Sequence, residues 1–447
     1  MKFTLRTAVA AIALALGTQA ALAAVTAEEA AKLKSILTPL GGEKAGNKDG
    51  SIPAWDGGYT KVAPGYKNGE PRPDPFAGEK PKFSINAANM AQHADKLSDG
   101  VKALLKKYPD FRLDVYPTHR SAAAPKWVYD NTFKNATTAK LEDENSVSGA
   151  FGGIPFPIPA DGAEAMMNHR LAWNGQSVNY ALRTFISTAD GRRALASEGD
   201  ENLQYPYYID GAYKGISQLG RFIVSGPASK AGEAILAHFS TDKDTPRSIW
   251  QYLVGQRRVR KAPSVSYDTP DFVTSGVGLF DEAFMMFGPI DRHEYKVIGK
   301  KEMYIPYNNN RSALVKIDEI MGPHFLNPDH VRWELHRVWE VEGTLKPGKR
   351  HTVPKRKYYL DEDSWQIVLF DGWDAKGDLW RMNYSLTYLV PDLPALVTNV
   401  MWGGYDLQTG AYYFNAAMNE AMPHYKVSEP RNEALWSPEE LANQGAR

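Results

Sequence analysis

Two pairs of polar residues carry the side chains best suited to acid–base chemistry. His119-Arg120 lies in the run VYPTHRSAAAP, and Asn168-His169 ends the run PFPIPADGAEAMMNH. A histidine oriented by a carboxylate could act as a general base on water or on a serine, which would indicate a hydrolase. The structural alternative is that these side chains satisfy buried backbone groups of loops. No nucleophile motif accompanies either pair, so the alternative is favoured.

A second candidate site is the cationic run GQRRVRK, residues 255–261. On a strand, Arg258 and Arg260 would point to one side and Arg257 to the other. Guanidinium groups in this arrangement could bind an anionic head group or an acidic partner. The structural alternative is a solvated strand face with ordinary ion pairs, which is the commoner use of exposed charge.

The third candidate is an aromatic stripe on two expected strands. Apolar and polar residues alternate from Trp380 to Val390, and largely so from Val331 to Val341. Such alternation is typical of antiparallel strands with one apolar and one wet face. The apolar side chains could line a pocket for a hydrophobic molecule or form plain core. The predicted pocket residues are Trp333, Leu335, Trp339, Trp380, Met382, Tyr384, Leu386 and Tyr388.

Most recognisable catalytic and cofactor motifs are absent. The sequence has no Gly-x-Ser-x-Gly elbow, no His-Glu-x-x-His pair, no phosphate-binding glycine loop and no dinucleotide fingerprint. It has no cysteine, which excludes thiolate metal sites and cysteine nucleophiles. Its 52 basic and 52 acidic side chains give no electrostatic footprint for nucleic acid. We therefore predict no catalytic residue, no metal, no cofactor and no nucleic-acid partner.

The first segment, Met1 to Ala23, is typical of a secretory signal peptide. Lys2 and Arg6 precede an apolar stretch, and Ala21-Leu22-Ala23 forms a small-x-small cleavage site. The apolar stretch is too short to cross a bilayer. We predict cleavage near Ala23-Ala24 and release of a soluble protein into the bacterial periplasm.

The elements that would position these candidates begin with an N-terminal region, residues 24–86. Thr26–Leu40 opens with a capping box between Thr26 and Glu29, which predicts a short amphipathic helix. Gly41–Lys82 is rich in glycine and proline, so we expect an extended arm wrapped over the body.

Residues 87–447 are expected to form one domain. Met90–Tyr108 has the spacing of a single helix with one buried face, and Asp161 with Glu164 caps another. Loops and short extended pieces are expected between these two helices. From about Val178 the pattern becomes predominantly β, and Ser437 begins a short terminal helix.

Several long motifs resemble a known family. They are LTPLGGEKAGNKDGSIPAWDGG, VYPTHRSAAAP, PFPIPADGAEAMMNH, WQYLVGQRRVRKAPSVSYDTP, GKKEMYIPYN and PKRKYYLDEDSWQIVLFDGWD. Together they resemble the exported bacterial domain-of-unknown-function family 1329 (DUF1329), which is similar in fold to the lipoprotein-localisation proteins of the LolA and LolB type. The resemblance implies a mainly β fold with α: a curved antiparallel sheet, or incomplete β-barrel, covered by a helical lid. It implies no catalytic residues.

The same resemblance implies a periplasmic carrier for a hydrophobic molecule such as a lipid. Partners would be an outer-membrane protein and an efflux-type inner-membrane transporter. Two other hypotheses stay open at this point. One is a non-catalytic adaptor that docks onto such a membrane protein, and the other is a periplasmic hydrolase of a lipid or ester that uses His119 or His169.

Overall fold

The computed structural model describes residues 25–262 and 266–445. The predicted signal peptide therefore lies outside the described residues. Within them, no helix combines the length and apolar character needed to cross a membrane.

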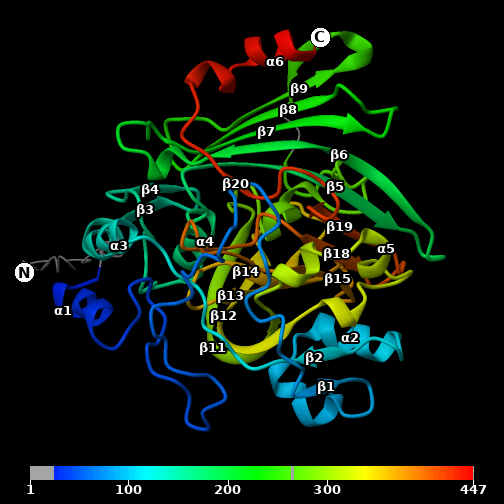
Figure 1. Cartoon of the computed structure of the whole chain (residues 1–447). Helices are drawn as coiled ribbons and strands as arrows, with labels where there is room; N and C mark the ends of the chain where they lie inside the picture. Colours follow the sequence, from blue (N-terminus) through cyan, green and yellow to red (C-terminus); the bar gives the residue numbers. More distant parts are fainter. Residues whose placement is uncertain (1–24, 263–265, 446–447) are drawn as a thin grey trace, which may run out of the picture.

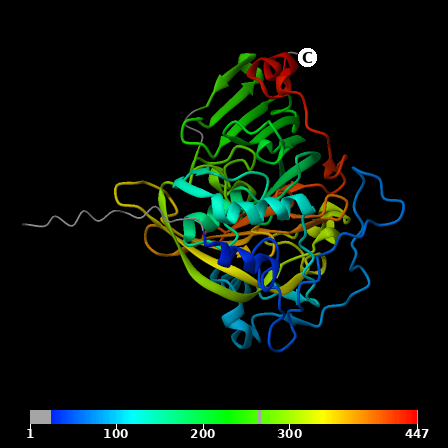
Figure 2. The same ribbon diagram turned by 90° about the vertical axis from the view of Figure 1, so that its left-hand side faces the viewer.

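Most strands belong to one large, curved sheet that does not close on itself (Figures 1 and 2). Its strands are β1 (Phe83–Ile85), β2 (Leu113–Val115), β5 (Ser177–Ser187), β6 (Arg193–Gln204), β7 (Ile216–Gly226), β8 (Ala234–Ser240), β9 (Ser248–Leu253), β10 (Arg258–Lys261), β11 (His293–Pro306), β12 (Trp333–Leu345), β13 (Lys355–Asp361), β14 (Ile367–Trp373), β15 (Leu379–Ser385), β18 (Trp402–Asp406), β19 (Tyr412–Ala417) and β20 (Lys426–Val427). Two small hairpins stand apart, β3 (Lys140–Asp143) with β4 (Ser146–Ser148) and β16 (Tyr388–Val390) with β17 (Ala395–Val397).

The sheet order is β1-β2-β12-β13-β14-β15-β18-β19-β5-β6-β7-β8-β9-β10, with β11 also paired to β12 and β20 to β5. All pairings are antiparallel except the single bridge between β2 and β12. Figure 1 shows β6–β9 in the upper half of the molecule and β11–β15 in the lower half. The expected mainly β, curved antiparallel architecture is therefore confirmed.

Six α-helices and several short 3-10 helices pack around this sheet within the described residues. The α-helices are α1 (Ala27–Ala31), α2 (Asp99–Lys107), α3 (Lys126–Thr138), α4 (Gly162–Arg170), α5 (Ile317–Ile320) and α6 (Pro438–Gly445). The 3-10 helices are η1 (Lys32–Lys34), η2 (Met90–Lys96), η3 (Pro206–Tyr208), η4 (Val254–Gln256), η5 (Phe280–Met285), η6 (Asn310–Ala313), η7 (Pro328–His330) and η8 (Glu433–Trp436).

The helix caps read from the sequence are present, but one expected helix is broken in two and another helix was not expected. The Thr26–Glu29 capping box forms, and Asp161 accepts a hydrogen bond from Glu164 N. The single helix expected over 90–108 is instead η2 followed by α2. The chain breaks there because the Ser98 hydroxyl caps α2 by accepting from Val101 N at 3.2 Å. The α3 region, expected as loop and extended pieces, is helical.

The glycine- and proline-rich arm contains no regular helix or strand between residues 35 and 82, as predicted. Figure 1 shows it in blue, crossing the face of the body. Trp55 Nε1 donates to Ala122 O at 3.1 Å, and the Phe76 ring stacks on His119 with centroids 4.1 Å apart. These aromatic contacts fix the arm to the domain.

The predicted wet face of the alternating strand is wrong. Arg381, Asn383 and Ser385 on β15 are all buried. The η5 segment covers their face of the sheet, and Arg381 donates to both Glu282 oxygens at 2.9 and 2.6 Å. The opposite face packs against α2. The strand also stops at Ser385, so Tyr388 lies on β16 instead. Alternation marks two different faces, but it does not show that the polar face meets water.

Candidate functional site

An apolar groove crosses one face of β6–β9, the outer part of the sheet. The strand register sets Leu203, Gly220, Ala237 and Ile249 side by side in one row across four strands. The two smallest side chains lie in the middle of this row. All four residues face the same side of the sheet, where they form the floor of the groove. The floor is deepest at Gly220 and Ala237 because these residues have little or no side chain. The groove has about 750 Å³ of free space, part of it open to solvent.

Aromatic side chains of η5 and of Phe287, which follows it in the chain, cover the groove. Phe284 and Phe287 lie 5.2 Å apart between ring centroids, and Phe287 lies 4.1 Å from Phe239 on the floor. Trp402 and Ala416 also line the groove, with the Trp402 ring 5.9 Å from that of Phe284. Phe284 has φ of 51°, a left-handed backbone that is costly for a bulky residue. The cover is therefore held in place by its surroundings rather than by local preference.

Two carboxylic acids line this mainly apolar groove. Burial raises the pKa of Glu201 to about 8 and that of Asp271 to about 6. Asp271 accepts a hydrogen bond from Val273 N at 3.0 Å. Glu201 accepts a backbone hydrogen bond from Arg221 but forms no ion pair with a cation of the described residues, and a carboxylate without a counter-charge is disfavoured in apolar surroundings. The protonated, neutral form of Glu201 is thus preferred at neutral pH, and it keeps the floor uncharged.

A polar pocket of about 560 Å³ adjoins the groove, including space open to solvent. The two share Gln218, Phe239, Phe284 and Phe287 as walls. The pocket itself is lined by polar groups from several elements: His169, Arg170, Asn174, Gln366, Thr398 and Asn399. Together the groove and the pocket form one continuous depression with an apolar end and a polar end.

His169, one of the predicted polar residues, lies at this junction. Its Nδ1 accepts from Ile367 N at 3.1 Å, and its Nε2 lies 3.2 Å from Phe284 O. Burial lowers the pKa of His169 to about 4, so the ring is neutral at neutral pH. Its neighbour Asn168 bonds both backbone groups of Phe156. Both ring nitrogens of His169 contact backbone groups, so no general base is poised here.

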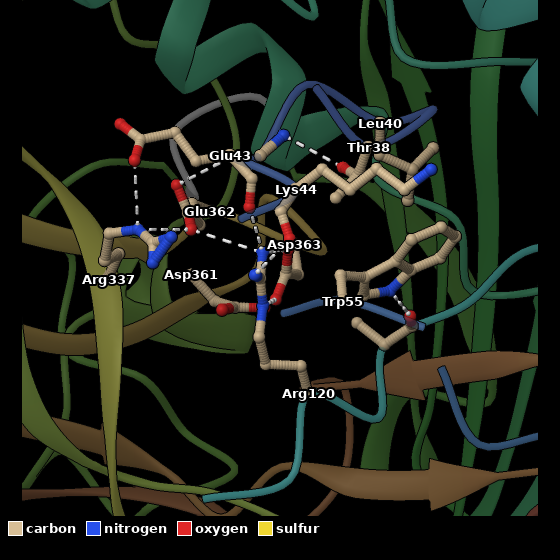
Figure 3. Close-up of polar contacts among 12 residues, drawn as sticks. Thr38, Leu40, Glu43, Lys44, Trp55, Arg120, Arg337, Asp361, Glu362 and Asp363 are labelled. Atoms are coloured by element: carbon tan, nitrogen blue, oxygen red, sulfur yellow. Dashed lines mark hydrogen bonds and ion pairs between the residues drawn. The ribbon is translucent and has the colours of Figure 1, made fainter. Parts of the chain in front are cut away.

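Arg120, another predicted polar residue, is the hub of a buried charge cluster that binds the arm (Figure 3). Its guanidinium donates to both Asp363 oxygens at 2.8 and 2.6 Å. The same group donates to backbone oxygens of the arm, with Glu43 O at 2.6 Å and three further carbonyls at 3.3 to 3.4 Å. Glu362 lies between two arginines and forms ion pairs with both. Its Oε1 is 3.4 Å from Nη2 of Arg120 and 3.0 Å from Nε of Arg337. Arg120 thus connects the arm to the β13–β14 turn.

This cluster includes the one group of side chains in the described structure with the spacing of a metal site. Ligand atoms of His336, Asp361 and Asp363 lie within 4.8 Å of one another. However, Arg120 already occupies both Asp363 oxygens, and His336 Nε2 lies 3.0 Å from Glu334. Burial and then repulsion from Asp363 raise the pKa of Asp361 to about 7. The Arg120 guanidinium supplies the positive charge that a metal ion would bring.

His119 lies in a different environment from His169. Its Nε2 is 2.7 Å from Glu79 Oε1, and its backbone N–H donates to Glu334. Within the described structure no serine, threonine or lysine shares these hydrogen bonds. The four predicted polar residues therefore do not form one site: His119 and Arg120 hold the arm, whereas Asn168 and His169 support the groove.

The predicted aromatic stripe lies on β12, β15 and β16, away from the groove. An added Cβ on Gly100 of α2 would lie 2.3 Å from Met382 Cγ, which shows how closely the helix packs on this face. The free space beside four of the stripe residues is about 340 Å³. Ligand contact stays a prediction for Trp333, Leu335, Trp339, Trp380, Met382, Tyr384, Leu386 and Tyr388.

The basic run lies at the outer edge of the sheet. Arg258 and Arg260 are exposed on β10, the terminal strand, and neither forms an ion pair with another of the described residues. Arg257 was expected on the strand but lies in the preceding turn, with φ of 48°. Among the described residues β10 pairs with a strand on one side alone, and an edge of this kind can pair with another chain.

Sequence reasoning missed the groove residues. Their signal was present: Gln218, Gly220 and Phe222 alternate on β7, and a glycine within a strand marks missing side-chain volume. That Gly220 lies opposite Ala237 follows only from the register of β7 with β8.

Comparisons with known proteins give consistent results. A family model described as "Protein of unknown function (DUF1329)" matches residues 84–442. The chain is 39% identical to "Uncharacterized protein PA3922" of Pseudomonas aeruginosa over 456 residues, covering 100% of this chain and 99% of that protein.

Among solved structures, it is similar to a DUF1329 family protein from Desulfovibrio piger, at 11% identity and TM-score 0.43, over 62% of this chain and 96% of that one. It is also similar to a putative outer membrane lipoprotein-sorting protein domain from Vibrio parahaemolyticus, at 14% identity and TM-score 0.44, over 63% and 98% of the two chains.

Proposed function

We propose that this chain, which belongs to the DUF1329 family of proteins of unknown function, is a periplasmic carrier that holds a hydrophobic molecule in the groove over β6–β9. The observation that carries the proposal is the row in which Gly220 and Ala237 leave space between larger apolar neighbours. A filled core would place larger side chains there. The aromatic cover formed by η5 supports the same function, since aromatic walls bury ligand surface effectively.

The apolar surface of such a groove sets the scale of the affinity. At about 25 cal/mol per Å², a ligand that buries roughly 300 Å² of apolar surface gains about 7 kcal/mol before the entropic cost of association. By itself this gain corresponds to a Kd of roughly 10 μM at best, so tighter binding requires a larger buried area or polar contacts with the ligand. Neutral Glu201 fits this role, because it leaves no charge on the floor beneath an apolar ligand.

The direct test is to purify the protein from its own bacterial periplasm without detergent and to identify the molecules extracted from it by mass spectrometry. An unrelated periplasmic protein, treated in parallel, is the control. A stoichiometric apolar compound supports the carrier. An empty protein that also fails to bind the neutral probe N-phenyl-1-naphthylamine would overturn it.

A second candidate function is docking onto an acidic partner through β10. It is supported by the exposed Arg258 and Arg260 on a terminal strand. A partner in the outer or inner membrane could pair with this edge by strand addition. Reversing both charges, Arg258→Glu with Arg260→Glu, should then abolish capture of a membrane protein while leaving binding of the neutral probe unchanged. Capture that persists would exclude this edge.

A further inference from the structure

Arg170 is a cation that lines the polar pocket without an acidic partner. Its guanidinium donates to two backbone oxygens, Asn145 O at 3.3 Å and Ser240 O at 3.0 Å. No carboxylate of the described residues lies within ion-pair distance of it. The positive charge of a buried guanidinium is usually balanced by a carboxylate or a phosphate. The charge of Arg170 is not balanced in this way, so the group can bind an anionic ligand.

The surroundings of Arg170 reinforce this preference. Burial, and repulsion from nearby Arg247, lower the pKa of Arg170 from its usual value to about 10. An anion in the pocket would stabilise the charged form of Arg170 and so offset both the cost of burial and the repulsion from Arg247. The cationic form still predominates at neutral pH, so the group is charged when a ligand arrives.

The pocket also presents an unsatisfied amide. Asn399 Nδ2 contacts the hydroxyl groups of Tyr205 and Tyr425 at 3.1 and 3.2 Å, whereas its Oδ1 accepts no hydrogen bond from the described residues. Asn399 is buried and lines the same pocket. Because Oδ1 is an acceptor, it calls for a hydrogen-bond donor such as a hydroxyl group or a water molecule; it adds to the polar character of the pocket but does not itself select an anion.

From these features we infer that the cargo is an amphiphile with an anionic head group, whose apolar chain lies in the groove and whose head lies beside Arg170 in the polar pocket. The inference rests on the proposed carrier function and extends it, because the shared walls Gln218 and Phe239 join the two compartments. A carboxylate and a phosphate monoester share the required chemistry, a small head with anionic oxygens.

The test compares three probes with the same chain, dodecanoate, dodecanol and dodecyl phosphate, below their aggregation concentrations at neutral pH. Calorimetry should show that the wild-type protein binds at least one of the two anions about tenfold more tightly than dodecanol, the gain expected for a charge-assisted hydrogen bond. The stronger of the two anions identifies the kind of head group.

Arg170→Gln should remove the preference for the anion, weakening binding of the anionic probe far more than binding of dodecanol, and Arg170→Lys should keep part of the preference. Binding of dodecanol also reports that each variant is folded. Equal affinity for all three probes in the wild-type protein, or a preference that survives Arg170→Gln, would overturn the anionic head group and leave the carrier standing. Failure to bind any of the three probes would overturn both proposals.

Discussion

The Nε2 atom of His169 lies 3.2 Å from the carbonyl oxygen of Phe284, and this contact joins helix α4 to the cover of the groove. Since His169 Nδ1 accepts from Ile367 N, the neutral ring must carry its proton on Nε2 and donate it to Phe284. The left-handed backbone of Phe284 is thereby tied to both a helix and a strand. His169 is a positioning residue for the cover rather than a catalytic one.

Replacing His169 by alanine should loosen the cover. We expect the affinity for N-phenyl-1-naphthylamine to fall several-fold, because Phe284 loses its tie and the aromatic wall becomes mobile. His169→Gln, which can still donate to the carbonyl, should lose less. Fluorescence titration measures the effect. Equal affinity in all three proteins would show that this contact does not hold the cover.

Acid should weaken the fold through the same residue. The folded pKa of His169, about 4, lies below the ordinary value of 6.5, so the unfolded chain binds the proton more readily. Stability should therefore fall as pH decreases from 6.5 through 4, by about 3 kcal/mol for this group. Urea denaturation across this range should give a shallower fall for His169→Gln than for the wild-type protein; parallel curves would contradict the assignment.

Opposite faces of β8 should respond differently to one substitution. Ala237 faces the groove, whereas Ala234 packs between the sheet and α6. We expect Ala237→Leu to leave the melting temperature nearly unchanged and to reduce probe binding at least tenfold by filling the floor. Ala234→Leu should instead cost about 1–3 kcal/mol through overpacking and keep the binding. If both variants lose similar stability, the groove is a filled core.

Raising the pH should lower both the stability of the fold and the binding of the neutral probe through ionisation of Glu201. Its raised pKa, about 8, means that the folded protein binds this proton more tightly than the unfolded chain does. Stability should thus decrease as pH rises from about 4.5 to 8, on the order of 2 kcal/mol after allowance for solvent access. Above pH 8, ionised Glu201 should also weaken binding of the neutral probe. Glu201→Gln should flatten both dependences, and an unchanged pH profile in this variant would assign them to another group.

The arm should depend on Arg120. Arg120→Ala leaves Asp363 buried without its cation, which should cost about 3–5 kcal/mol. Arg120→Lys keeps the charge but cannot make both bonds to Asp363 and the bonds to arm carbonyls together. We expect limited proteolysis within residues 41–82 to be rapid for the Arg120→Ala variant, intermediate for the Arg120→Lys variant and slow for the wild-type protein. Equal cleavage rates would show that the aromatic contacts alone hold the arm.

Local features of this protein could be predicted from sequence because they depend on neighbouring residues. The Thr26–Glu29 capping box, the Asp161 cap, the irregular arm and the β alternation on β12 and β15 all follow from spacing within one segment. The break at Ser98 was missed because its hydroxyl offers a cap that helical periodicity does not reveal.

The position of the groove, and which strand faces are covered, could be learned only from the tertiary structure. Arg381 looked like a solvent-facing residue until η5, about a hundred positions earlier, placed Glu282 against it. Gly220 and Ala237 form the floor of the groove only because β7 and β8 pair in that register. Alternation fixes which side of a strand a residue occupies, but the elements that cover that side determine whether it faces water, packed core or a cavity. Local sequence thus indicated most of the elements, although not α3 or the break at Ser98, and long-range pairing determined the site.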